Sequence, residues 1–347
     1  MEEEIRKAKS LLVDLLSIRS TSGEEEPIAR YLADVLRDLG FRTSIHNIYG
    51  KSYNVIVNDS PRPALVIATH MDTVEQYVAP KIVDEYTIAG TGACDAKGSI
   101  VATIMALERL RDLPDGVSVA FFSEEETSGG GSAQYLISHT PRSALILEPT
   151  DLRICLEGYG GLEGAIRITG RRMHPCVAGD LWEKSSIARM FRVLKALSSN
   201  LSETGYIFVP YAIKCGDCTE YCIPSECKAC FDVLIPWGRS PSECLSILRD
   251  LSSKYDFILT VTEYSYPFRT EEPSFIRRLS VAYSKAFGRS AEFSKMPSWT
   301  DANNFAERGI PVGVFGPGSL AYAHSDRELI DVRDILRASR FLECLMR

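Results

Sequence analysis

Histidine and acidic side chains follow several apolar segments of this chain, at the points where those segments end. Two of the segments are 65–68 and 117–122, and two further side chains lie in or just after glycine-rich stretches. In open α/β sheets, ligands gather outside the carboxyl ends of the strands, so we expect these side chains to meet. The side chains concerned are His70, Asp72, Asp95, Glu124, Glu125, Glu126, Glu148 and His324.

These residue types suit a metal centre. Imidazole and carboxylate are ligands that fit zinc, cobalt or manganese. Two histidines and three acids can hold two divalent ions, with one carboxylate bridging them. Two ions about 3.5–4 Å apart can polarise a carbonyl and activate a shared water, and a further glutamate can take the proton of that water as general base. Three adjacent carboxylates at a buried strand end also need cations nearby.

Short strands and helices alternate over the first 158 residues. An N-cap at Ser22 is expected to start the second helix. This alternation predicts an α/β sheet with helices on both faces. We predict helices at 3–18, 24–39, 98–111 and 131–138, and strands at 53–57, 64–69, 117–122 and 144–147.

The pattern changes in the middle of the chain and then returns. Its order there is strand, helix, two strands, helix and strand, which is the βαββαβ pattern of a ferredoxin-like domain. We therefore expect a catalytic domain made of residues 1–158 and 267–347, with a smaller domain, 159–266, inserted into it. The predicted elements are strands 163–169, 205–213, 227–235 and 257–263 and helices 181–198 and 241–254, followed by helix 274–287, strand 311–315 and a final helix from 332.

Taken in order, the motifs resemble those of the M20 family of metallopeptidases and amidohydrolases, over essentially the whole chain. The resemblance implies a zinc-peptidase-type α/β catalytic domain with an inserted ferredoxin-like lid. The lid would also be the domain through which two chains form a homodimer. The motifs that carry it are His70-x-Asp72, Gly90-x-Gly-x-x-Asp95-x-Lys-Gly98, Glu125-Glu126, Glu148-Pro149 and Ala323-His324.

The resemblance also implies a role for each metal ligand. His70 and Glu148 would bind one ion, and Glu126 and His324 the other. Asp95 would bridge the two ions. The expected cofactor is thus a pair of divalent ions, with zinc favoured and cobalt or manganese as alternatives.

Three further residues receive catalytic roles from the same resemblance. Asp72 would orient His70, as a carboxylate behind a metal-bound histidine commonly does. Glu125 would be the general base, with its neighbour Glu124 as the less favoured choice. His174 of the lid would stabilise the oxyanion in the active site of the partner subunit. The family pattern further predicts a cis peptide bond between Asp95 and Ala96.

Three arginines and two histidines lie outside these motifs. Arg171, Arg172 and Arg269 are candidates to bind a substrate carboxylate, and the sequence does not select among them. His46 and His139 match no motif, and we expect them at the surface.

Five of the ten cysteines lie between residues 215 and 230. Their spacing superficially resembles that of zinc or iron–sulfur sites. However, Cys227 and Cys230 fall in a predicted strand, where a spacing of three places them on opposite faces. Disulfide bonds, free thiols and a metal cluster all stay open for this group.

Composition excludes several classes of protein. The formal net charge is −7 and no basic stretch offsets it, which disfavours a nucleic-acid binder. The apolar runs are strand-sized, whereas a membrane-spanning helix needs about 20 residues. The chain opens with three glutamates where a signal peptide would be basic. We therefore expect a soluble, cytoplasmic protein without a nucleic-acid or membrane partner.

The expected reaction is metal-dependent hydrolysis of an N-acyl amide that releases an amino acid. The substrate would be a small N-acyl amino acid, such as acetylornithine or acetyl-lysine, or a carrier protein linked to lysine or ornithine. A di- or aminopeptidase of the same family is the alternative within the hydrolases. Two other classes stay open: a catalytically silent homologue that binds an amino acid or peptide, and a structural or redox protein built around the cysteine group.

Overall fold

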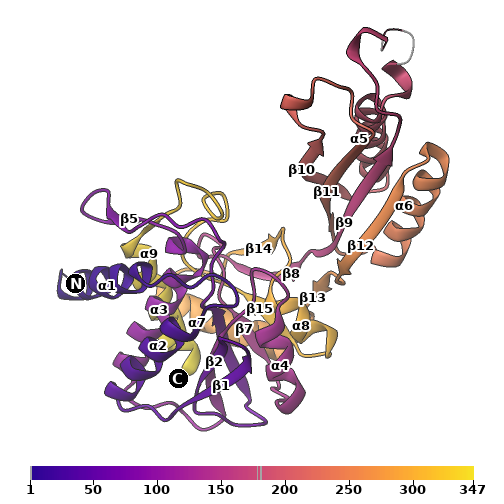
Figure 1. The fold of residues 1–347 in the computed structure, drawn as a ribbon. Coiled ribbons are helices and arrows are strands. Elements are labelled where there is room, and N and C mark those ends of the chain that lie inside the picture. The colour runs from indigo at the N-terminus through magenta and orange to yellow at the C-terminus, as the bar shows by residue number, and fades with distance from the viewer. Residues whose placement is uncertain (1, 178, 180–181) are drawn as a thin grey trace. The chain divides into compact units, whose positions relative to one another are not determined.

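The computed structural model describes residues 2–177, 179 and 182–347 (Figure 1). They form two compact units. The first unit comprises the chain through Glu157 together with Arg269–Met296 and Thr300–Arg347. The second unit comprises Gly158–Phe268 together with Pro297–Trp299. None of the helices in the described part of the chain has both the length and the apolar composition that crossing a bilayer requires.

A nine-stranded mixed sheet organises the first unit. Its central strands β6, β3, β7 and β15 run parallel to one another, so their carboxyl ends lie at one edge of the sheet. Strands β3, β6 and β7 are buried along their whole length, as expected when helices cover both faces. In sheet order the strands are β1 (Thr43–Tyr49), β2 (Ser52–Val57), β6 (Val117–Phe122), β3 (Leu65–His70), β7 (Ala144–Ile146), β15 (Val312–Val314), β8 (Ile154–Gly158) and β13 (Phe268–Arg269), and β14 (Phe293–Met296) pairs with β8.

Helices cover both faces of this sheet, as the sequence predicts. Side chains alternate between the two faces of the sheet along β3. Ile67 belongs to the hydrophobic core between one face and five of the helices, and Ala68 points to the opposite face. On that other side α4 and α8 lie next to each other (Figure 1), and Phe122 packs with Tyr135 and Phe305. The five helices of the larger core are α1 (Glu2–Ser17), α2 (Glu26–Asp38), α3 (Gly98–Leu110), α7 (Pro273–Phe287) and α9 (Val332–Met346), and the other two are α4 (Gly130–Ser138) and α8 (Asp301–Glu307).

A small three-stranded sheet leads into the glycine-rich turn that carries Asp95. Its order is β16 (Leu329–Asp331), β5 (Thr87–Ala89) and β4 (Lys81–Ile82). The helical turn η1 (Ala93–Lys97) follows and continues directly into α3. The bond between Asp95 and Ala96 is cis, which confirms that prediction.

The second unit has the chain order β9–α5–β10–β11–α6–β12. Its four strands form an antiparallel sheet in the order β10-β11-β9-β12, and burial alternates strictly along most of β11. The helix expected at 181–198 begins at Ser186, where Ser185 accepts a capping bond from the Ala188 amide; residue 181 lies outside the described residues. The elements are β9 (Gly160–Thr169), α5 (Ser186–Glu203), β10 (Ile207–Cys215), β11 (Glu226–Ile235), α6 (Pro241–Tyr255) and β12 (Ile258–Tyr264), with short 3₁₀ turns at Pro175–Val177, Trp182–Lys184 and Cys218–Glu220.

One disulfide bond shows the state of two of the cysteines between residues 215 and 230. Cys215 on β10 is bonded to Cys227, its neighbour on β11. Cys227 is buried and Cys230 faces the opposite side of the strand, as the spacing predicts. Among the cysteines whose side chains are described, the other seven are free, and none belongs to a group that could hold a metal. The structure therefore favours a bridge over a metal cluster.

Removing this disulfide is expected to destabilise the second unit. The bonded cysteines are 12 residues apart, and closing a loop of that length stabilises a fold by about 3 kcal/mol in the chain-entropy account. The Cys215→Ser/Cys227→Ser variant should therefore unfold at lower urea, whereas Cys176→Ser, which removes an exposed free thiol, should not. Non-reducing peptide mapping without a linked Cys215–Cys227 peptide would contradict the assignment.

The surface expectation is wrong for one of the two unassigned histidines. His139 is only 6% exposed, and its ring stacks on Tyr135 with 4.0 Å between centroids. Its Nε2 lies 2.8 Å from Asp59 Oδ1, while the exposed His46 places Nε2 2.7 Å from Asp59 Oδ2. The prediction failed for His139 because the carboxylate of Asp59, which is distant in sequence, compensates for the cost of burying the imidazole.

Replacing Asp59 by asparagine is expected to lower the free energy of unfolding by about 1–3 kcal/mol, because the buried His139 loses its charged partner. Burial acts to raise the pKa of Asp59, but its bonds to His139 and His46 outweigh burial and lower it. The stabilisation is therefore full above about pH 5 and is lost as the pH falls through the lowered pKa. Urea unfolding at several pH values, with the exposed Asp112→Asn as control, tests this; equal stability of Asp59→Asn and wild type at pH 7 would contradict it.

Candidate metal centre

The parallel strands bring the predicted ligands to one edge of the sheet. Strand β3 ends at His70, and Glu148 follows two residues after β7. The segment that contains Glu126 follows β6, which lies beside β3. Asp95 reaches this edge from the turn before α3, and His324 from the loop before β16.

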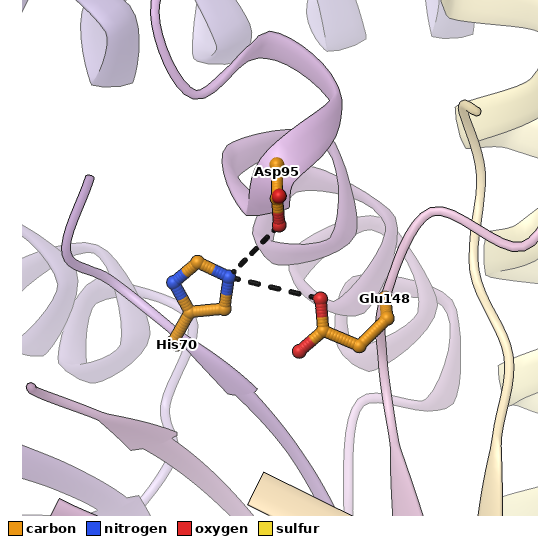
Figure 2. Close-up of side chains that lie close together, drawn as sticks. All are labelled: His70, Asp95 and Glu148. Atoms are coloured by element: carbon orange, nitrogen blue, oxygen red, sulfur yellow. Dashed lines mark hydrogen bonds and ion pairs between the residues drawn. The ribbon is translucent and has the colours of Figure 1, made fainter. Parts of the chain in front are cut away.

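A first group consists of His70, Asp95 and Glu148 (Figure 2). His70 Nε2 lies 3.1 Å from Asp95 Oδ1 and 3.8 Å from Glu148 Oε2. All three residues are buried, at 8% exposure or less. Their ligand atoms therefore converge on one point that water scarcely reaches.

A second group consists of Asp95, Glu126 and His324. His324 Nε2 lies 2.7 Å from Glu126 Oε2 and 3.6 Å from Asp95 Oδ2. Asp95 thus turns one carboxylate oxygen toward each group. The hydrogen bond that His324 donates to the Glu126 carboxylate is the main cause that raises the pKa of His324 to about 9.

The electrostatics of the site fit bound cations. Burial raises the pKa of Glu148 well above its ordinary value, and the nearby charge of Asp95 adds to the rise. Glu148 Oε1 is buried and has no hydrogen-bond partner among the described residues. Burial acts to lower the pKa of His70, but Glu148 and the other carboxylates around it raise it overall. A cation would relieve the cost of burying these carboxylates, and imidazole with carboxylate oxygen is a donor set for zinc, cobalt or manganese.

The main chain fixes which nitrogen His70 presents. Its Nδ1 lies 3.0 Å from the backbone carbonyl oxygen of Asp72. Because a carbonyl oxygen can only accept, Nδ1 must carry a proton, and Nε2 is the nitrogen that faces Asp95 and Glu148 and that would bind a metal ion.

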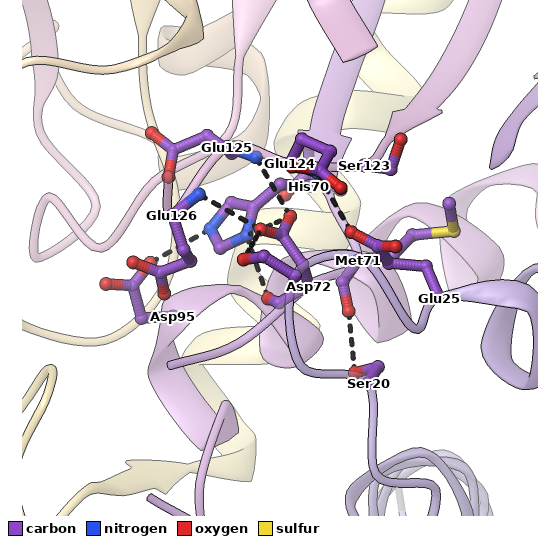
Figure 3. A network of polar contacts seen from close by, with 12 residues as sticks. Ser20, Glu25, His70, Met71, Asp72, Asp95, Ser123, Glu124, Glu125 and Glu126 are labelled. Atoms are coloured by element: carbon purple, nitrogen blue, oxygen red, sulfur yellow. Dashed lines mark hydrogen bonds and ion pairs between the residues drawn. The ribbon is translucent and has the colours of Figure 1, made fainter. Parts of the chain in front are cut away.

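The carboxylate of Asp72 organises the glutamate segment (Figure 3). It is fully buried. Its Oδ1 accepts from the Glu125 amide at 3.1 Å, and its Oδ2 accepts from the Glu126 amide at 3.0 Å. Ser22 Oγ also donates to Oδ2, at 2.6 Å. The N-cap prediction for Ser22 is therefore wrong: α2 starts at Glu26, and a tertiary contact engages the hydroxyl instead.

The three consecutive glutamates have different surroundings. Glu124 is buried, and its carboxylate accepts hydroxyl bonds from Ser52 at 2.5 Å and Thr127 at 3.0 Å. Glu125 is held through its backbone by Asp72, and burial raises the pKa of its carboxyl well above the ordinary value. Of the two candidate bases, Glu125 is the one whose carboxylate has no hydroxyl donor among the described hydrogen bonds.

No sequence motif assigns a role to two buried acidic residues near the site. Glu25 accepts from the Glu124 amide at 3.1 Å, and burial together with Asp72 raises its pKa to about 7. Asp301 is fully buried, accepts from Ser132 Oγ, and has its pKa raised by burial to about 7. Glu25 stands in a run of three glutamates, which by sequence alone indicates a solvated face.

The remaining candidates lie outside the two ligand groups. His174 is an exposed residue of the second unit, with Nδ1 2.9 Å from Cys176 Sγ and its ring 5.8 Å from that of Tyr221. Arg172 pairs with Glu220 at 3.5 Å, and Arg269 pairs with Glu271 at 3.3 Å. Their predicted roles toward a substrate stay predictions.

Comparisons with known proteins agree with this fold. The family model described as "Peptidase family M20/M25/M40" matches residues 66–347. A LysW-lysine/LysW-ornithine hydrolase of Sulfurisphaera tokodaii is 26% identical over 342 residues, which cover 97% of this chain and 95% of that protein.

Two solved structures share the fold along the whole chain. An M20 family metallo-carboxypeptidase from Sulfolobus solfataricus superposes with a TM-score of 0.76 at 17% identity, covering 100% of this chain and 99% of that one. A dinuclear metal-binding peptidase of the M20 family from Bacillus subtilis superposes with a TM-score of 0.69 at 13% identity, covering 100% and 98%.

Proposed function

Because the chain belongs to the peptidase family M20/M25/M40 and is a metal-dependent hydrolase of that family, we propose that it releases lysine or ornithine from a carrier protein by hydrolysing an amide bond. The observation that carries this proposal is the match along nearly the full chain to a LysW-lysine/LysW-ornithine hydrolase. Two groups of possible metal ligands that share Asp95 support it further.

The proposed centre holds two divalent ions, with zinc as the proposed metal. His70, Asp95 and Glu148 would hold one ion and Asp95, Glu126 and His324 the other, so that Asp95 would belong to both sets of ligands. When bound, such ions polarise the scissile carbonyl and lower the pKa of a water molecule.

Glu125 is the proposed general base. Its carboxylate takes a proton from the attacking water as the new C–O bond forms at the amide carbon. It then gives that proton to the leaving nitrogen as the C–N bond breaks, so that a carboxylate and a free amine are released. Burial raises the pKa of the Glu125 carboxyl above its ordinary value, and Asp72 keeps the Glu125 backbone in place.

His174 is the proposed oxyanion stabiliser, acting in the active site of the partner subunit of a homodimer. Its Nδ1 accepts from the Cys176 backbone amide at 3.2 Å, so in the neutral ring Nε2 carries the proton and can donate it to an oxyanion. The homodimer is supported by the edge strand β10, which exposes Ile207, Val209, Tyr211 and Ile213, because an exposed apolar edge favours pairing with another chain.

The other functions are less well supported. A peptidase is favoured by the names of both solved structures of this fold, and at 17% and 13% identity those structures speak for the fold alone. A silent homologue would be expected to lack ligands or the base, whereas His70, Asp95, Glu126, Glu148, His324 and Glu125 are all present. A structural or redox protein is less well supported because the chain belongs to a family of hydrolases.

A panel of substrates distinguishes these functions. It contains lysine and ornithine joined by an amide to a carrier protein, N-acetyl-lysine, N-acetylornithine and dipeptides with a free α-amine. We expect zinc-loaded protein to release the amino acid from the carrier conjugate. Preferential cleavage of the dipeptides would show a peptidase instead, and silence on every substrate by protein with two bound metals would favour the binding homologue.

A further inference from the structure

The turn that presents Asp95 is not held by its own hydrogen bonds alone. Asp95 and Ala96 depart from helical geometry, with φ/ψ of −122°/88° and −127°/30°. Gly92 lies in the left-handed region at φ +85°, where an added Cβ would meet Thr73 Cγ2 at 2.8 Å. The backbone amides of such an irregular buried turn need acceptors from elsewhere in the chain.

Glu328 supplies these acceptors. Its Oε1 accepts from the amides of Cys94 at 2.9 Å and Asp95 at 3.0 Å, and its Oε2 accepts from the amide of Gly92 at 2.8 Å. The main-chain oxygen of Glu328 also accepts from the Gly90 amide at 3.1 Å. The side chain is buried, at 4% exposure. Hydrogen bonds to an ionised acceptor are about twice as strong as neutral ones.

Glu328, whose carboxylate binds the amides of the Asp95 turn, lies in the same segment as His324 of the second ligand group. It follows His324 by four residues and stands immediately before β16. Strand β16 pairs with β5, with Leu329 opposite Ala89, and the turn begins at Gly90. The strand pairing therefore sets the register in which the Glu328 carboxylate meets the three amides.

We propose that Glu328 is a positioning residue for the metal centre, which acts by fixing the backbone of Asp95 and thereby the bridging carboxylate. This inference rests on the proposed two-metal site. Asp95 must turn one oxygen toward His70 and the other toward His324, so a small rotation of its backbone would misdirect both. Glu328 prevents that rotation, and it joins the turn to the same segment that carries His324.

The test replaces Glu328 by glutamine, which keeps the size of the side chain and removes its charge. An amide also places an NH₂ group where a carboxylate oxygen accepts, so at least one of the three amides loses its partner. The matched control is Asp326→Asn, which removes one charge from an exposed position in the same loop. Zinc affinity is measured by competition with a chelator, and the visible spectrum of the cobalt-loaded protein reports the geometry of the site.

Loss of a residue that orients a metal ligand typically costs 10–100-fold in metal affinity. We expect Glu328→Gln to lower zinc affinity by about 10–100-fold and to change the cobalt spectrum, with Asp326→Asn like wild type in both. The metal-free variant should unfold at nearly the wild-type temperature. Metal-free Glu328→Gln that is unfolded where the metal-free wild type is folded would show a general structural role and overturn the proposal.

A double-mutant cycle with Asp95→Asn gives the second criterion. If Glu328 acts through Asp95, Glu328→Gln should lower zinc affinity little further in the Asp95→Asn background. An equal loss in both backgrounds would overturn the proposal, as would wild-type affinity in the single variant. A wild-type protein that binds no zinc would instead refute the metal centre itself.

Discussion

Replacing Glu125 by glutamine is expected to lower kcat by about 10²–10⁴-fold, the range that a positioned general base contributes. Glutamine has nearly the same size, but its amide cannot take the proton of the attacking water. The backbone bond from Glu125 to Asp72 does not depend on the side chain, so the variant should bind metal as the wild type does. Steady-state kinetics together with metal analysis of the same preparation measure both quantities.

Glu124→Gln is the comparison that assigns the base. The Glu124 carboxylate already accepts from Ser52 and Thr127, so its replacement should alter stability more than the chemical step. Near-wild-type kcat for Glu125→Gln, together with a large loss for Glu124→Gln, would transfer the role to Glu124.

Replacing Asp95 by asparagine is expected to have an effect on both metals at once. The carboxylate lies between His70 and His324, at 3.1 Å and 3.6 Å from their Nε2 atoms. An amide offers only one oxygen and carries no charge, so it cannot serve both groups. We expect metal content to fall below two ions per chain and kcat/KM to fall on the order of 10³-fold, since the metals supply several kcal/mol of transition-state stabilisation.

Elemental analysis of dialysed protein and kinetics at saturating zinc test this prediction, with Asp326→Asn as the control of equal charge change. Two tightly bound ions and normal turnover in Asp95→Asn would show that Asp95 does not bridge them.

Much of the geometry of the site follows from sequence, because it depends on local patterns. The strand predicted at 64–69 is observed at Leu65–His70, and the helix predicted at 98–111 is observed at Gly98–Leu110. Once strands are parallel neighbours, the residues after them must gather at one edge. The ends of the parallel neighbours β3 and β7 therefore bring His70 and Glu148 together, as the sequence predicts.

What the sequence could not show depends on contacts between distant segments. Ser22 satisfies a local capping rule, yet it donates to Asp72, and Glu25 looks like a surface charge although it is buried beside Glu124. Glu328 is separated from Asp95 by 233 positions, and no spacing rule connects them. The strand alternation separates Cys227 from Cys230, but it does not identify Cys215 as the partner of Cys227.

Release of lysine or ornithine from its carrier-protein conjugate, by metal-stripped protein before and after zinc is added back, tests the central claim most directly. We expect no release from the stripped protein and restored release as zinc approaches two ions per chain. Hydrolysis that continues at the same rate after the metal has been removed would contradict the account.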